Sequence, residues 1–169
     1  IKWPNDIQVE GETGRTLTGE YFDKTDQVFC KAAAFDGTDT GPMVAAKNSV
    51  EVVNTPPSIE KALLSPEEVD RSGTLSCAYE GWDDPDPADS PSALFAWYVV
   101  ADEGSLTEVE GAASADLSAA SLTPGDKILC SVTPVDVDSE GDALESNTAT
   151  VINSAPSIQD VQLGPADAL

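Results

Sequence analysis

Two clusters of acidic residues carry most of the chemistry that this sequence could perform. Calcium takes six to eight oxygen ligands, chiefly from carboxylates and backbone carbonyls, and tolerates irregular geometry. The spacing in Asp84-Pro85-Asp86 and in Asp136-Val137-Asp138 allows two carboxylates to converge on one ion. Neither cluster has the full EF-hand pattern, and aspartates are also ordinary turn residues, so solvated acidic loops are the alternative. The candidate calcium ligands are Asp83, Asp84, Asp86, Asp89, Asp136, Asp138, Glu140 and Asp142.

Catalysis has little support, because the chain contains no histidine. This excludes imidazole acid–base chemistry, the Ser-His and Cys-His nucleophile pairs, and zinc sites built on histidine. No glycine-rich phosphate loop is present either. Paired carboxylates could in principle hydrolyse glycosides, but here they occupy turn-like segments without an obvious cleft. We therefore expect no enzymatic activity and no catalytic residue.

The charge balance limits the partners. The chain holds 31 acidic residues and 8 basic ones, and after Arg71 the basic residues are reduced to Lys127. Such a surface repels nucleic acid and anionic lipid, because binding those requires basic side chains. It suits either divalent cations or a salt-rich habitat. No apolar run approaches the length of a membrane span.

The sequence repeats itself at an interval of about one hundred residues. Segment 24–30 (KTDQVFC) reappears as 124–130 (PGDKILC), and segment 54–59 (NTPPSI) reappears as 153–158 (NSAPSI). An internal repeat of this kind is typical of a tandem array.

Three units follow from this period. We expect residues 1–54 to be the C-terminal part of a first repeat, residues 55–153 a complete repeat, and residues 154–169 the first strand of a following one. The mid-repeat start has two explanations. It is a truncation, or it is natural and a neighbouring copy completes the first unit by strand addition.

The three cysteines fit the same period, because Cys30 and Cys130 occupy equivalent places. The simplest pairing joins Cys77 to Cys130. Cys30 would then pair with a counterpart of Cys77 that lies before residue 1. Such cystines imply an oxidising, extracytoplasmic compartment, whereas buried free thiols are the alternative.

Short segments of alternating polarity predict an all-β fold. Seven strands in about one hundred residues favour a sandwich of two antiparallel sheets. A tryptophan, Trp97, is expected in its core beside the cystine, and Trp3 is expected to play the same part in the preceding unit. The predicted strands are 58–64, 73–79, 93–100, 105–109, 115–122, 126–133 and 143–152.

The motifs of the complete unit also carry a family resemblance. They are NTPPSI at 54–59, TLSC at 74–77, GWDDPD at 81–86, FAWYV at 95–99 and GDKILC at 125–130. This order resembles immunoglobulin-like tandem repeats of large secreted bacterial surface proteins and, more distantly, cadherin-like and polycystic-kidney-type modules. Ile128 stands where antibody domains carry the tyrosine of the tyrosine corner. The resemblance implies immunoglobulin-like β-sandwich repeats in a tandem array.

The expected function is a structural repeat of an extracellular bacterial surface protein, either an adhesin stalk or a surface filament. Both acidic loops and the linker at Asn54 should lie at one pole of the sandwich, so that calcium could stiffen the joint between units. Its partners would be neighbouring repeats of the same chain, or further copies in a filament. The alternative is a carbohydrate- or ligand-binding module, which would use Tyr79, Trp82, Phe95 or Tyr98. The sequence does not name an adhesive target.

Overall fold

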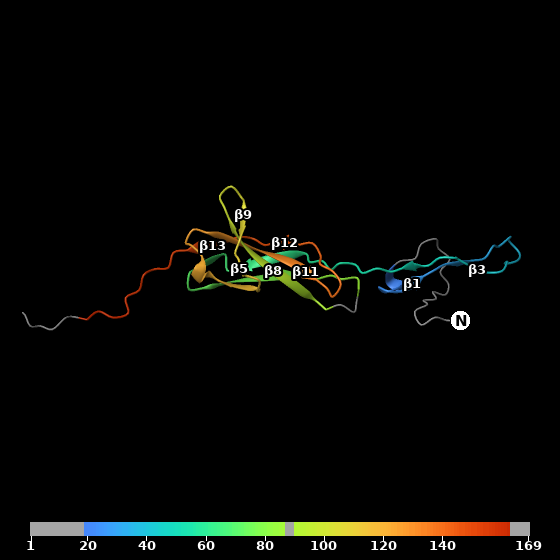
Figure 1. Cartoon of the computed structure of the whole chain (residues 1–169), viewed down its shortest axis with the longest axis horizontal. Helices are drawn as coiled ribbons and strands as arrows, with labels where there is room; N and C mark the ends of the chain where they lie inside the picture. The colour runs from blue at the N-terminus through green and yellow to red at the C-terminus, as the bar shows by residue number, and fades with distance from the viewer. Residues whose placement is uncertain (1–18, 87–89, 163–169) are drawn as a thin grey trace, which may run out of the picture.

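A computed structural model describes residues 19–86 and 90–162 of the chain; Trp3 and Asp89 lie outside these ranges. The described residues are all-β, as predicted: they form short strands and two single 3-10 turns, with no α-helix among them. Figure 1 shows three parts along one long axis. They are a hairpin segment (19–53), a body (56–152) and an extended tail (153–162), and residues 54–55 connect the first two.

The body contains two sheets. Neighbouring strands run antiparallel, except that β6 pairs with β13 in parallel. The three-stranded sheet has the order β10 (Asp116–Ser118), β7 (Thr74–Glu80), β5 (Lys61–Ser65). The six-stranded sheet has the order β6 (Glu68–Asp70), β13 (Ala149–Ile152), β11 (Lys127–Val135), β8 (Ser92–Val100), β9 (Leu106–Glu108), and β12 (Leu144–Glu145) also pairs with β11.

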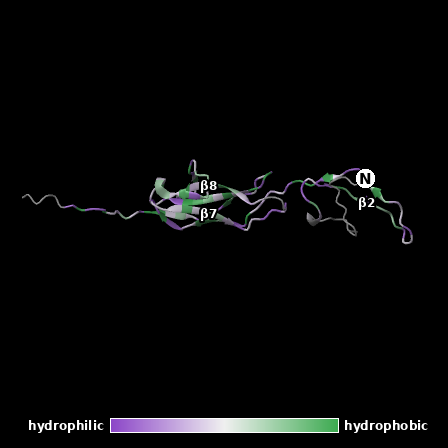
Figure 2. Cartoon of the chain, turned by 90° about the horizontal axis from the view of Figure 1, so that it is seen from below, coloured by the Kyte–Doolittle hydropathy of each residue, from purple (hydrophilic) through white to green (hydrophobic). Residues whose placement is uncertain are grey.

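Alternation explains why these segments are strands. Successive side chains of a strand point to opposite faces. In β7, Leu75 and Cys77 are buried while Thr74, Ser76 and Ala78 between them are exposed. The buried half of a strand with this pattern turns toward the core, and Figure 2 shows hydrophobic residues concentrated in strands such as β7 and β8.

One core joins the two sheets. Its buried residues come from both, and a disulfide links Cys77 of β7 to Cys130 of β11, which confirms the predicted pairing. Trp97 of β8 lies opposite Cys130 in the strand register and is completely buried. Its indole Nε1 donates a hydrogen bond to the carbonyl oxygen of Ser114 at 2.8 Å, so its one polar atom is satisfied.

Four of the differences from the predicted strands exceed two residues. The predicted strand 58–64 begins only at Lys61, as β5. Strand β6 was not predicted, because its pairing with β13 is parallel and long-range. The predicted strand 115–122 ends at Ser118, where the serine hydroxyl caps the 3-10 turn η2 (Ala119–Ser121). The predicted strand 143–152 divides into β12 and β13. Between them, the amide of Asn147 bonds both the N–H and the C=O of Leu64.

The hairpin segment is built from paired short strands. After the 3-10 turn η1 (Gly19–Tyr21), β1 (Gln27–Val28) pairs with β4 (Val50–Glu51), and β2 (Lys31–Ala32) pairs with β3 (Val44–Ala45). Its thiol Cys30 is exposed and free. Large apolar side chains are exposed along it: Phe29, Phe35, Met43, Val44, Val50 and Val53.

Backbone hydrogen bonds of the hairpin segment recur one hundred positions later. Gly41 N donates to Ala34 O at 2.8 Å, and Gly141 N donates to Pro134 O at 2.8 Å. The isolated bridge between Phe35 and Thr40 has the counterpart Val135 with Glu140. The two stretches thus share a local conformation.

Candidate functional site at the joint

The first acidic loop of the body holds the linker from one side. Ser58 and Asp83 exchange two backbone hydrogen bonds, at 2.8 and 3.0 Å. Asp86 is only 7% exposed, and its Oδ2 accepts the backbone N–H of Thr55 at 2.8 Å. A buried carboxylate is stable only with such donors. The linker backbone therefore satisfies Asp86 and is tied to this loop.

The second acidic loop holds the linker from the other side. The side-chain amide of Asn54 donates to Asp136 Oδ2 at 3.0 Å and to Ser139 Oγ at 2.8 Å. Asp136 Oδ1 meanwhile accepts the backbone N–H groups of Asp138 and Ser139, which closes a tight turn around the carboxylate. Both carboxylate oxygens of Asp136 are therefore engaged, Oδ1 within the turn and Oδ2 by the linker.

These donors lower the pKa of Asp136. The hydrogen bond from Asn54 is the largest cause, and the N–H groups of Asp138 and Ser139 and the Ser139 hydroxyl act in the same direction, so that the pKa falls to about 2. Hydrogen bonds to the ionised form favour it over the protonated acid. Asp136 therefore stays charged over the whole neutral and mildly acidic range.

A lysine of the hairpin segment spans the joint. Lys24 Nζ lies 2.9 Å from Asp138 Oδ2 and donates to Asn54 Oδ1 at 3.1 Å. Its side chain is 18% exposed, against 52% for Asp138. The ammonium thus connects the hairpin segment, the linker and the body, and it neutralises one of the clustered carboxylates.

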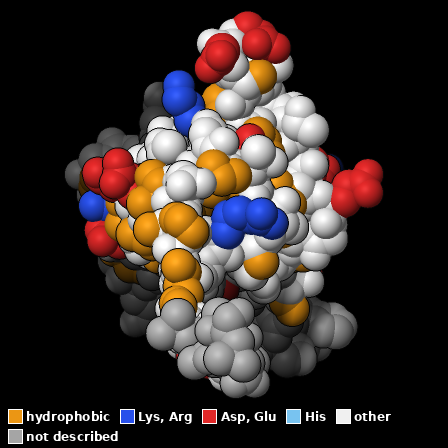
Figure 3. Space-filling model, turned by 90° about the vertical axis from the view of Figure 1, so that its left-hand side faces the viewer, with side chains coloured by type: hydrophobic (Ala, Val, Ile, Leu, Met, Phe, Trp, Pro, Cys, Tyr) orange, Lys and Arg blue, Asp and Glu red, His pale blue; other side chains and the backbone are white. Residues whose placement is uncertain are grey.

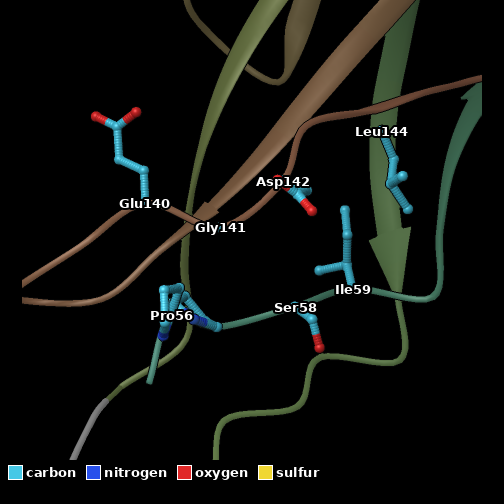
Figure 4. A pocket seen from close by; sticks show the side chains of 8 residues that line it. Pro56, Ser58, Ile59, Glu140, Gly141, Asp142 and Leu144 are labelled. Atoms are coloured by element: carbon cyan, nitrogen blue, oxygen red, sulfur yellow. The ribbon is translucent and has the colours of Figure 1, made fainter. Parts of the chain in front are cut away.

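A glycine allows the linker to approach the second loop. A Cβ built on Gly141 would collide with the carbonyl oxygen of Pro57. Figure 4 shows Gly141 near the linker, and the side chains of Ile59 and Leu144 close to each other. A pocket of about 400 Å³ opens here. Its lining residues are Pro56, Pro57, Ser58, Ile59, Glu140, Gly141, Asp142 and Leu144.

The other candidate calcium ligands are spread around the joint. Glu140 and Asp142 are exposed and line the pocket. Asp83 contacts the linker through its backbone, which exchanges hydrogen bonds with Ser58. Asp84 Oδ1 accepts the N–H of Asp86 at 2.9 Å, while its Oδ2 is buried without a hydrogen-bond partner. Asp89 lies outside the described residues.

The donor set as arranged does not fit a calcium cage. Within residues 19–86 and 90–162, no three histidine, cysteine or acidic side chains come together in a way that could hold a metal ion. Protein groups already occupy oxygens of Asp86, Asp136 and Asp138. Calcium binding stays a prediction, which calorimetric titration of the chain with calcium chloride tests.

The aromatic candidates for ligand binding are partly buried. The rings of Tyr79 and Trp82 lie 6.3 Å apart, and both pack against the core, as does Phe95. On the face that Figure 3 shows, a group of acidic side chains lies on the protrusion at the top, which is the hairpin between β8 and β9. Tyr98 is partly buried as well, and ligand binding by these aromatic residues stays a prediction.

Three residues of the joint were not predicted as part of it: Lys24, Ser139 and Gly141. Asn54 was placed in the linker at this pole, but no contact was predicted for its side chain. Gly141 left a signal in the repeat, because its counterpart is Gly41. Lys24 left no such signal, because position 124 is a proline.

This chain matches no protein-family model and no curated protein. No helix in the described part of the chain is long and apolar enough to cross a membrane.

Proposed function

We propose that the body is one immunoglobulin-like β-sandwich repeat of a tandem array, and that the array is a structural element of an extracellular bacterial surface protein. The shared core of two sheets, closed by the cystine and Trp97, supports the sandwich. The hairpin segment is then the C-terminal part of the preceding repeat. Residues 153–162 begin the following one.

The recurrence of hydrogen bonds supports the repeat most strongly. Asp26 Oδ2 accepts the N–H of Asp23 at 2.9 Å, and Asp126 Oδ2 accepts the N–H of Thr123 at 2.8 Å. Thr25 has a positive φ of 74°, where the counterpart Gly125 has 101°. A non-glycine residue rarely adopts this conformation, so its recurrence points to one shared local fold.

The joint supports a spacer role. A stalk must transmit orientation from unit to unit, and here the linker is bonded to both acidic loops while Lys24 bridges to Asp138. These contacts attach the linker to the body at several points, and each hydrogen bond or ion pair opposes its movement. The unit therefore functions as a stiff element of an adhesin stalk or a surface filament.

The extracellular location rests on the cystine. Disulfides form and persist in oxidising compartments, and this one joins the two sheets of the body. The acidic surface keeps neighbouring arrays apart by charge repulsion, which suits a crowded cell surface.

A unit-exchange experiment tests the proposal. In the protein as it exists in its cell, residues 56–152 are replaced by a different sandwich unit of equal length, and surface display and adhesion are measured. A spacer tolerates the exchange. Loss of adhesion with display intact would instead favour the carbohydrate- or ligand-binding module, and detection of the array only in permeabilised cells would refute the surface location.

A further inference from the structure

Strand β8 is apolar on both of its faces. Toward the core it presents Trp97, which is completely buried, and Phe95, which packs against the core. Its outward residues are uncharged: Leu94, Ala96, Tyr98 and Val100. An antiparallel strand with one solvated face normally alternates apolar with polar residues, whereas a nearly continuous apolar run is typical of a strand that is covered on both faces. The outer face of β8 nevertheless remains accessible, because Leu94 is 52% exposed.

The apolar outer face continues onto the two neighbouring strands. Leu106 of β9 lies opposite Val100 in the strand register and is 40% exposed, and Leu129 of β11 lies opposite Tyr98. The other sheet is different, since the outward residues of β7 are polar except for one alanine. The described strands of the body therefore leave an apolar surface uncovered over β8.

The backbone of β8 also has an open edge, on the side away from β11. In an antiparallel ladder, successive residues direct their N–H and C=O groups alternately to one side and the other. The carbonyl oxygen of Trp97 accepts the N–H of Val109 at 2.8 Å, so Trp97 points away from β11. Ala93 and Phe95 must point the same way, and Ala93 indeed lies opposite Pro134, which has no N–H to offer. Among the described residues, no strand pairs with Ala93 or Phe95 on this side.

The chain itself turns away from this edge. Strand β9 pairs only with the last three residues of β8, and Figure 1 shows it in a hairpin that projects from the body. After Val109 the backbone forms a turn, in which Ala112 N donates to Val109 O at 3.2 Å and Gly111 has a positive φ of 77°. The carbonyl of Ala115 then accepts the N–H of Cys77, which belongs to the other sheet. Residues 110–115 therefore cross between the sheets and do not continue along β8.

The charge around β8 defines the kind of partner. Glu108 lies opposite Tyr98 on the outer face, and Glu110 follows the last residue that bonds to β8; both glutamates are exposed. The whole chain carries 31 acidic residues against 8 basic ones. A second copy would bring like charges together, which opposes association, whereas a basic partner is attracted.

We propose that β8 binds an extended segment of a partner protein, which adds as a strand along residues 92–96 and carries a short apolar stretch flanked by lysine or arginine. Its backbone exchanges hydrogen bonds with Ala93 and Phe95, as in other cases of strand addition. Its apolar side chains cover Leu94 on the outer face and complete the cover of Ala93 and Phe95, which are only partly buried. Its basic side chains lie near Glu110. The body thus has a binding partner of its own, beyond a spacer role.

Titration of the full chain with a synthetic peptide tests this. The probe is acetylated and amidated, and it has three valines with two lysines on each side. Its binding should slow hydrogen exchange at the amides of Ala93 and Phe95. A peptide with glutamate in place of lysine should bind at least tenfold more weakly. N-methylation of all three valines should also weaken binding by about tenfold or more, because the backbone hydrogen bonds to β8 are lost.

Variants of the chain test the same contacts from the other side. Ala93→Pro removes an N–H of the open edge, a position where a strand tolerates proline, and should weaken peptide binding by about fivefold or more. Glu110→Gln should weaken it by about two- to fivefold. Glu103→Gln is the matched control at the tip of the hairpin and should leave it unchanged. Thermal unfolding checks that each variant is folded, and the N-methylated peptide gives an answer that needs no variant.

The outcomes separate the parts of the proposal. Unchanged exchange at Ala93 and Phe95, or equal affinity for the N-methylated peptide, would overturn strand addition. Equal affinity for the glutamate peptide would overturn the basic partner. If the chain alone formed a concentration-dependent dimer that protected the same two amides, the occupant would be a second copy and the proposed partner would be wrong.

Discussion

The side chain of Asn54 donates to Asp136 Oδ2 at 3.0 Å across 82 residues of sequence. The same amide accepts a hydrogen bond from Lys24 Nζ at 3.1 Å. One neutral side chain therefore connects a cation of the hairpin segment with an anion of the body. This bridge adds to the direct contact of Lys24 with Asp138 across the same joint.

Replacement of Asn54 should raise the pKa of Asp136. In Asn54→Ala the largest cause of the lowered pKa is gone, so the pKa should move from about 2 toward the ordinary 3.8. Carboxyl NMR titration measures this directly. Asn153→Ala, which removes an equivalent residue bonded only to Ser154 in the described structure, is the control and should leave the titration unchanged.

The free energy of unfolding should fall as the pH is lowered below about 4. Because the pKa of Asp136 is lower in the folded chain than its ordinary value of 3.8, its contribution is complete above that value and is lost as the pH falls toward 2. Urea unfolding followed between pH 5 and pH 2 should show this loss. In Asp136→Asn the acid-dependent part should shrink, and an unchanged pH profile would contradict the assignment.

Removal of the Lys24 ammonium should loosen the joint without unfolding the body. An ion pair that is partly exposed contributes about 0.2–1 kcal/mol and is weakened by salt. In Lys24→Met, distances between spin labels on the hairpin segment and the body should broaden. Raising the salt concentration should broaden them in the parent chain as well, while Lys47→Met should have no effect.

Reduction of the cystine should destabilise the body strongly. Cys77 and Cys130 are separated by 53 positions, and closing a loop of that length contributes about 4 kcal/mol in the chain-entropy model. Denaturant unfolding of Cys77→Ala/Cys130→Ala should show a loss of this order. Cys30→Ala removes an exposed free thiol and should leave the unfolding midpoint in place.

Two equivalent glycines should respond differently to the same change. Gly141→Ala forces a methyl group against the Pro57 carbonyl and should cost about 1–3 kcal/mol of folding stability. Gly41→Ala meets no such obstacle in the free chain. Equal unfolding midpoints for the two variants would show that the linker does not press on Gly141.

Local patterns made the core of the body predictable. Ile128, Cys130 and Val132 alternate along one strand, and all three are completely buried on the predicted face. The cystine followed from the period of the repeat. These inferences needed only neighbours in sequence and the rule that strand side chains alternate.

The joint was less predictable, because its contacts are long-range. The acidic loops were placed correctly beside the linker, but the sequence suggested calcium as their counter-charge. In the described structure an asparagine amide, backbone N–H groups and the Lys24 ammonium contact carboxylates of these loops. Calcium binding itself stays a prediction. Nothing in the spacing of Lys24 and Asp138 relates residues 114 positions apart.

The cystine also has a mechanical consequence. A pulling force enters the body near Pro56 and leaves near Ile152, while residues 78–129 lie inside the covalent loop that Cys77 and Cys130 close. Once every hydrogen bond has broken, the force passes through the disulfide, and those residues bear no load. An extended chain spans ~3.4 Å per residue, so the disulfide prevents about 180 Å of the lengthening that full extension of the body would otherwise allow. In the proposed stalk, the disulfide would therefore limit lengthening under tension, and its reduction would remove that limit.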